Sequence, residues 1–215
     1  MKDKLNKFSF GVGDRFAHQA KAQLQAIIRA KESGCNITPV WNKSYREHEI
    51  IGSESVSTRS AVDKAVSDLN WVDPYFLDAD HINLKNVDFF IHTCDFYTID
   101  VADYIGHSID EENQKEFYEK NKKFIGYLKL PGLTSIQVVP ELIKSVAKKY
   151  LHAVHEAKRI YDHIRSKLGN ENFVVEISMD ETDKPQTPDE LFFILAAISD
   201  LDIPINTIAP KFSGS

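Results

Sequence analysis

Short apolar runs alternate with stretches of helical periodicity along most of the chain, and this alternation most constrains the fold. Strands are predicted at residues 8–13, 37–41, 75–77, 88–92, 173–180 and 203–209, and helices at residues 17–31, 58–69, 111–125, 141–168 and 188–199. A polar run is expected at residues 42–49, a small helical excursion at residues 98–106 and a turn at residues 128–133. Strands that alternate with helices build parallel sheets through crossover helices. We therefore expect an α/β protein with a parallel sheet, either an open doubly wound sheet or a partial or complete TIM-like (β/α) barrel.

The length favours one domain. The chain has 215 residues, of which 42% are hydrophobic and 27% charged, and these fractions are ordinary for a globular protein. A complete (β/α) barrel takes about 250 residues. Residues 1–215 are therefore predicted to form a single α/β domain, or a segment of a larger barrel enzyme.

Charge and cysteine content restrict the partners and the compartment. The net charge of −6 disfavours nucleic acid as a partner, because binding phosphates needs a dense basic face. No apolar segment reaches the length of about 18 residues that a membrane span needs, so no membrane partner is expected. Cys35 and Cys94 form no CxxC pair, which favours a reducing cytoplasm. A partial barrel would expose strand edges, and this leaves a homo-oligomer open.

Three polar groups fall where predicted strands end. They are Asp14-Arg15, the stretch Asp78-Ala79-Asp80-His81, and Glu176 with Asp180-Glu181. Ligands bind outside the carboxyl ends of parallel strands, so these groups are candidates for one site. Glu176 lies within an apolar strand, where a carboxylate needs a hydrogen bond, an ion pair or a cation. The alternatives are a polar turn at Asp78–His81 and a structural ion pair at Glu176.

Other catalytic motifs are missing from the sequence. Residues 8–14 contain two glycines but not the third glycine of a dinucleotide-binding loop, and no lysine followed by Ser or Thr completes a phosphate-binding loop there. No GxSxG elbow is present, which lowers the case for a serine hydrolase.

Five stretches together make the chain resemble the tagaturonate epimerase family of bacterial hexuronate catabolism. They occur in the same order and span nearly the whole chain: residues 8–16, 76–82, 100–106, 176–182 and 208–212. The resemblance implies a barrel-like, metal-dependent isomerase that interconverts tagaturonate and fructuronate, with a small sugar acid as its partner. Two alternative interpretations are a catalytically incomplete carbohydrate-binding or assembly subunit, and another metal-dependent sugar isomerase or aldolase.

The resemblance also implies roles for individual residues. Asp80 is expected to be the general base, and Glu176 a partner acid or ligand. His81 and Asp180 are expected to hold a divalent cation, whose identity among Mn, Ni, Co and Zn stays open. Arg15, Lys43 or Lys211 could bind the substrate carboxylate. C4 is not adjacent to the C2 carbonyl, so simple deprotonation there gives an unstabilised carbanion. A retro-aldol cleavage of the C3–C4 bond, followed by re-addition to the other face of the aldehyde, would instead invert C4.

Overall fold

A computed structural model describes residues 5–129, 132, 135–169 and 172–214. Contacts divide the chain into two compact units. The first comprises residues 1–99, 162–176 and 205–207, and the second comprises residues 100–161, 177–204 and 208–215. Each unit is described by itself.

The first unit has alternating strands and helices. Its elements are β1 (Ser9–Gly13), α1 (Ala20–Glu32), β2 (Thr38–Ser44), α2 (Tyr45–Ile51), α3 (Ser55–Asp68), β3 (Phe76–Ile82), the 3-10 helix η1 (Val87–Phe89) and most of β4 (Phe96–Asp100). Helix α2 begins where β2 ends, because the Ser44 side chain accepts a hydrogen bond from the Glu47 amide and the Glu47 carboxylate accepts one from the Ser44 amide. This capping box starts a helix in a polar stretch that has little helical periodicity.

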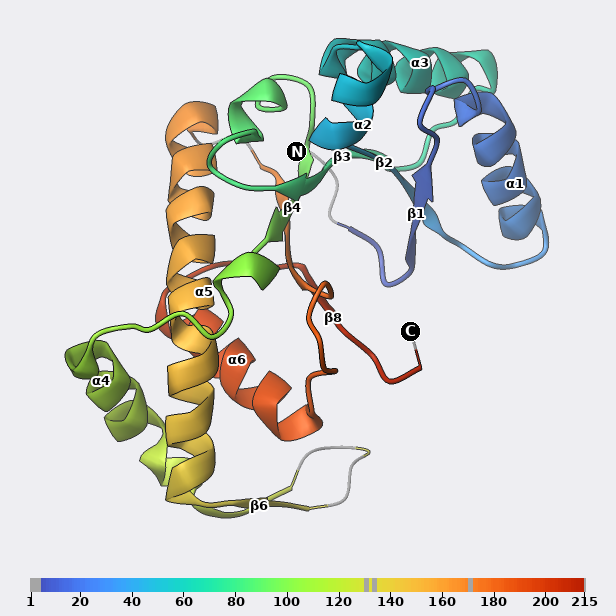
Figure 1. Cartoon of the computed structure of the whole chain (residues 1–215). Helices are drawn as coiled ribbons and strands as arrows, with labels where there is room; N and C mark the ends of the chain where they lie inside the picture. The colour runs from blue at the N-terminus through green and yellow to red at the C-terminus, as the bar shows by residue number, and fades with distance from the viewer. Residues whose placement is uncertain (1–4, 130–131, 133–134, 170–171, 215) are drawn as a thin grey trace. The chain divides into compact units, whose positions relative to one another are not determined.

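The strands form a six-stranded sheet in the order β1-β2-β3-β4-β7-β8, where β7 is Val174–Met179 and β8 is Thr207–Pro210. In Figure 1, β2 lies between β1 and β3. The pairs β1–β2, β2–β3 and β3–β4 are all parallel. The parallel sheet with crossover helices confirms the predicted α/β class and has the topology of a partial (β/α) barrel.

One face of these strands carries an apolar layer, and the next layer along the strands is polar. Val40, Phe76, Phe96 and Val174 form a buried hydrophobic cluster, one residue from each of four strands. Side chains two residues apart share a face of a strand. The next residues on the same face are therefore those two positions toward the carboxyl ends: Asn42, Asp78, Thr98 and Glu176.

The opposite face of β2 packs against helices. The indole nitrogen of Trp41 donates a 3.0 Å hydrogen bond to Gln23 Oε1 on α1. Lys43, two residues further on the same face, is 2% exposed and donates to Ser53 Oγ just after α2. Successive side chains of β2 thus point to opposite faces: Trp41 and Lys43 face the helices, and Asn42 lies on the polar face.

The second unit contains η2 (Ala102–Tyr104), α4 (Glu111–Asn121), η3 (Lys122–Phe124), the hairpin strands β5 (Gly126–Leu128) and β6 (Ile136–Val138), most of α5 (Pro140–Leu168), and α6 (Pro188–Asp200). Helix α5 buries a stripe that includes Ile143, Val146, Tyr150 and Val154. Residues three and four apart share one face of a helix, as predicted for this segment. Lys149 Nζ lies 2.8 Å from Glu190 Oε1 and ties α5 to α6.

Two predicted elements are wrong. Residues 88–92 were expected to form a strand, but Val87–Phe89 is a 3-10 helix, and the strand is β4 at Phe96–Asp100. Both segments are rich in aromatic residues, and Phe90 and Ile91 are buried without strand pairing. Residues 98–106 were read as a helical excursion, whereas only Ala102–Tyr104 is a short helix. The hairpin β5–β6 was not predicted, and part of the turn expected at residues 128–133 lies outside the described residues.

No helix in the described part of the chain is both long enough and apolar enough to cross a membrane.

Candidate active site

A layer of polar side chains near the carboxyl ends of β2, β3, β4 and β7 makes the candidate active site. We call Asn42, Asp78, Thr98 and Glu176 the polar layer. Its residues lie one step beyond the apolar cluster, so the sheet that forms the core also presents these groups. In parallel α/β proteins the carboxyl ends of the strands are where ligands bind.

Thr98 joins two carboxyl groups of the polar layer. Its hydroxyl oxygen lies 2.9 Å from Asp78 Oδ2, 3.1 Å from Asp78 Oδ1 and 3.3 Å from Glu176 Oε1. The Thr98 amide also donates to Asp78 Oδ1 at 3.1 Å. Burial, with the nearby charge of Asp80, raises the pKa of the Asp78 carboxyl well above its ordinary value, although the hydrogen bonds from Thr98 oppose this. Burial therefore shifts Asp78 toward its neutral form.

Asp80 and His81 lie in an irregular part of β3. The β3–β4 register shifts between Ala79 and Ile82, and His81 has a φ of 52° in the left-handed region. Bulges of this kind redirect side chains next to active sites. Asn42 Nδ2 donates to Asp80 Oδ2 at 3.3 Å, so Asp80 lies on the same face as the polar layer. The His81 Nε2 to Asp80 Oδ1 distance is 3.9 Å.

Gly13 at the end of β1 gives Asn42 its space. A Cβ atom on Gly13 would lie 3.1 Å from Asn42 Oδ1, closer than ordinary van der Waals contact. Asn42 Oδ1 itself is buried and has no hydrogen-bond partner among the described residues. A glycine at this position therefore lets the asparagine lie against β1.

The three predicted carboxylate-binding cations have different surroundings. Arg15 Nε lies 3.8 Å from Glu47 Oε1 and the Arg15 side chain is exposed. Lys43 is on the helix-facing side of β2, away from the polar layer, and burial lowers the pKa of its ammonium group. Lys211 follows β8, and its amide donates to Gln186 Oε1 at 2.7 Å. Substrate binding by these residues stays a prediction.

The predicted metal ligands lie in different units. His81 belongs to the first unit, while Asp180 in the second follows β7 and accepts a 2.7 Å hydrogen bond from Ser178 Oγ. Imidazole and carboxylate donors suit a divalent cation. Within the described ranges, however, no three His, Cys, Asp or Glu side chains are grouped so that they could hold a metal ion. The described residues therefore give no complete metal site by themselves, and we derive no step through one.

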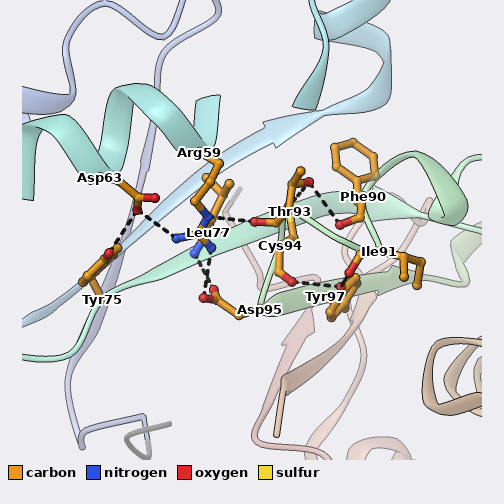
Figure 2. Close-up of polar contacts among 10 residues, drawn as sticks. All are labelled: Arg59, Asp63, Tyr75, Leu77, Phe90, Ile91, Thr93, Cys94, Asp95 and Tyr97. Atoms are coloured by element: carbon orange, nitrogen blue, oxygen red, sulfur yellow. Dashed lines mark hydrogen bonds and ion pairs between the residues drawn. The ribbon is translucent and has the colours of Figure 1, made fainter. Parts of the chain in front are cut away.

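A second polar cluster lies at the amino ends of β3 and β4 (Figure 2). Its centre is Arg59 on α3, which donates to Thr93 O at 2.8 Å and Asp95 Oδ2 at 2.9 Å and pairs with Asp63 at 3.3 Å. Asp95 Oδ1 in turn accepts from the Leu77 amide at 2.7 Å. The cluster borders a cavity of about 790 Å³. Its charges are already paired, and this end of a barrel sheet serves stability more often than catalysis.

Sequence reasoning missed two members of the polar layer and left a third without a role. Thr98 was placed in an expected helical excursion, because the strand Phe96–Asp100 was not recognised. Asn42 falls in the predicted polar run at residues 42–49, and Asp78 has no predicted role. The aromatic and β-branched residues Phe96, Tyr97 and Ile99 were the available signal for the missed strand.

The sheet topology and the acidic polar layer define a (β/α)-barrel type of protein with its candidate site at the carboxyl ends of the strands. A family model described as UxaE, tagaturonate epimerase, matches residues 1–215. The chain therefore belongs to the tagaturonate epimerase family. No match was found among curated proteins.

Solved structures support the same fold. The native crystal structure of fructuronate-tagaturonate epimerase UxaE from Cohnella laeviribosi matches with a TM-score of 0.79 and 22% sequence identity. A structure of the same protein complexed with one glycerol matches equally well. In both cases the match covers 97% of this chain and 44% of the other, so the chain spans less than half the length of these relatives. At this identity the likeness shows the fold alone.

Proposed function

We propose that the polar layer and Asp80 form part of the active site of a sugar-acid epimerase that interconverts tagaturonate and fructuronate. Family membership over residues 1–215 supports this choice of substrate class. The observation that carries the assignment to these residues is the convergence of Asp78, Asp80 and Glu176 at the carboxyl ends of the strands, where Thr98 and Asn42 contact them. A sugar acid offers hydroxyl groups that such carboxylates can bind and deprotonate.

In the proposed reaction Asp80 accepts the proton of the C4 hydroxyl group. The C4–O bond becomes a carbonyl, the C3–C4 bond breaks, and its electron pair forms an enediolate over C2 and C3. Re-addition of C3 to the other face of the aldehyde restores the bond, and Asp80 returns the proton to O4. Every atom and electron is conserved, and only the configuration at C4 changes. Isotope exchange from solvent into C3, or its absence, would separate this route from a transient oxidation at C4.

Asp80 is suited to this role by its position. The Asn42 amide holds one of its oxygens, and the bulge in β3 sets its direction. A general base must lie within hydrogen-bond reach of the proton that it abstracts. Glu176 supplies a second carboxyl group, linked through Thr98, that can donate a proton to a substrate oxygen.

The test is an assay on tagaturonate with the Asp80→Asn variant. We expect turnover to fall by about 100-fold or more, because general base catalysis contributes factors of this size. Asp68→Asn is the matched control, since Asp68 is a surface residue of α3 that pairs with Lys64. Turnover of Asp80→Asn equal to that of the control would refute the assignment.

A second candidate, a catalytically incomplete carbohydrate-binding or assembly subunit, is favoured by the 44% coverage of the relatives. Tagaturonate binding without turnover by residues 1–215, measured by calorimetry, would support it. Metal dependence is a separate proposal: His81 is one ligand of a divalent cation. Metal content of the purified protein should fall in His81→Ala and stay unchanged in His18→Ala, which replaces an exposed histidine.

A further inference from the structure

We propose that Thr98 is a positioning residue of this site, whose hydroxyl bridges Asp78 to Glu176 and holds one carboxyl proton in line between them. The proposal rests on the proposed function for its catalytic consequence. Its structural part is independent of any activity, because it concerns where a proton lies.

The number of hydrogen-bond donors supports this extra proton. A threonine hydroxyl has one proton to donate and lone pairs to accept with. Its oxygen lies within 3.3 Å of oxygens from two different carboxyl groups, Asp78 and Glu176. If both were ionised, only one could receive that proton, and the other would face a lone pair at hydrogen-bond distance. We therefore place a proton on one of the two carboxyl groups, which then donates to the Thr98 oxygen.

The surroundings assign the extra proton to Asp78. Asp78 is 6% exposed and Thr98 is 3% exposed, whereas Glu176 is partly exposed. Burial disfavours a charged carboxylate, and the pKa of Asp78 is raised accordingly. Asp78 Oδ1 accepts the Thr98 amide, so Oδ2, which lies 2.9 Å from the hydroxyl oxygen, carries the proton.

The resulting hydrogen bonds all point in one direction, from Asp78 to Glu176. The Asp78 O–H donates to Thr98 Oγ1, and the Thr98 O–H donates to Glu176 Oε1. To deliver a proton to a substrate oxygen, Glu176 takes the Thr98 proton, and the Asp78 proton then replaces that of Thr98. The reverse transfer restores the starting state, so no proton is gained or lost. Thr98 also fixes the direction of the Glu176 carboxyl group.

Three substitutions separate this role from simple packing. Thr98→Val keeps the shape and removes the hydroxyl, while Thr98→Ser keeps the hydroxyl. Thr58→Val is the matched control, because Thr58 is a buried threonine of α3 whose hydroxyl has no hydrogen-bond partner in the described part of the chain. Folding of each variant is checked by circular dichroism.

The first readout is the infrared absorption of protonated carboxyl groups at neutral pH. We expect a band that disappears in Asp78→Asn, shifts in Thr98→Val, and stays in place in Thr98→Ser and Thr58→Val. The absence of any band that depends on Asp78 would overturn the proposal. A band whose position stays the same in Thr98→Val would also overturn it. If Thr98→Val fails to fold, Asp78→Asn in the otherwise natural chain still decides where the proton lies.

The second readout is turnover of tagaturonate. Thr98→Val should lower kcat by about tenfold or more with little change in KM, and Thr98→Ser should restore it, because proton delivery acts on the chemical step. Equal kcat in Thr98→Val and Thr58→Val would refute the positioning role. A chain without turnover would count against the proposed function alone, because the infrared result does not depend on it.

Discussion

At the scale of single residues, the candidate site depends on side chains that hold others in place. Asn42 and Thr98 contact the carboxyl groups of Asp80, Asp78 and Glu176. Neither residue type performs acid–base chemistry by itself, so a search of the sequence for catalytic residue types passes over both. Their contribution is to fix geometry, and displacements of about 1 Å at a site can cost large factors in rate.

Gly13 provides a test of this dependence. A methyl group in Gly13→Ala would meet Asn42 Oδ1 at 3.1 Å and push the amide away from β1. We expect a loss of about 1 kcal/mol in the free energy of unfolding, typical of a mild overpacking. Denaturant unfolding measures this loss of free energy. The signals of the Asn42 side-chain amide in an NMR spectrum should also shift.

Gly11→Ala is the control for this change, because Gly11 lies on the same face of the same strand and a Cβ there meets nothing within 4 Å. Its stability should stay within about 0.5 kcal/mol of the natural chain. Equal effects of the two substitutions would show that Asn42 is not held against Gly13.

At the scale of secondary-structure elements, Arg59 joins α3 to the segment that leads into β4, and Asp95 in that segment accepts from the Leu77 amide of β3 (Figure 2). Asp95 is 8% exposed, and desolvation alone would make its charge costly there. Arg59 and the Leu77 amide compensate that charge at 2.9 and 2.7 Å. The cluster thus sets the start of both strands, and with it the positions of residues further along them.

Arg59→Ala is expected to destabilise the fold by about 3 kcal/mol, because it leaves Asp95 with an unpaired charge in a buried position. Arg29→Ala, at an exposed position of α1, should cost less than about 0.5 kcal/mol. Thermal unfolding followed by circular dichroism compares the two. A similar midpoint for both variants would mean that the cluster does not stabilise the sheet.

At the scale of the whole molecule, β1 is the last strand at one end of the sheet order described here. Phe8 and Phe10 next to and within it are each 58% exposed. An exposed apolar edge strand is a template for pairing with another chain. We therefore expect residues 1–215 to self-associate at micromolar concentrations in analytical ultracentrifugation.

Phe10→Lys should reduce this association, because a charged side chain on an edge strand opposes pairing. Val72→Lys is the control: Val72 is 90% exposed but lies outside the strands. Association that weakens equally in both variants would point to general apolar exposure and not to the edge of the sheet.

The sequence predicted the class of fold well, because periodicity reports local burial. The helix at residues 141–168 was found almost to the residue, as α5 is Pro140–Leu168. It predicted β4 badly, since Phe89, Phe90 and Ile91 look as apolar as a strand while Thr98 and Asp100 interrupt the pattern. The site followed the same division: Asp80 and Glu176 were identifiable by type, whereas Thr98 and Asn42 became visible only through their partners in space.

The spacing of the apolar and polar layers has a consequence for how such a site can vary. Phe76 and Asp78 are neighbours on one face of β3. A slip of one residue in strand pairing would place Leu77 and Ala79 on the face of the polar layer and turn Asp78 toward the helices. The bulge begins at Ala79, beyond Asp78, and leaves the register below it intact. Substitutions from Asp80 onward can therefore alter chemistry while the register that assembles the core stays the same.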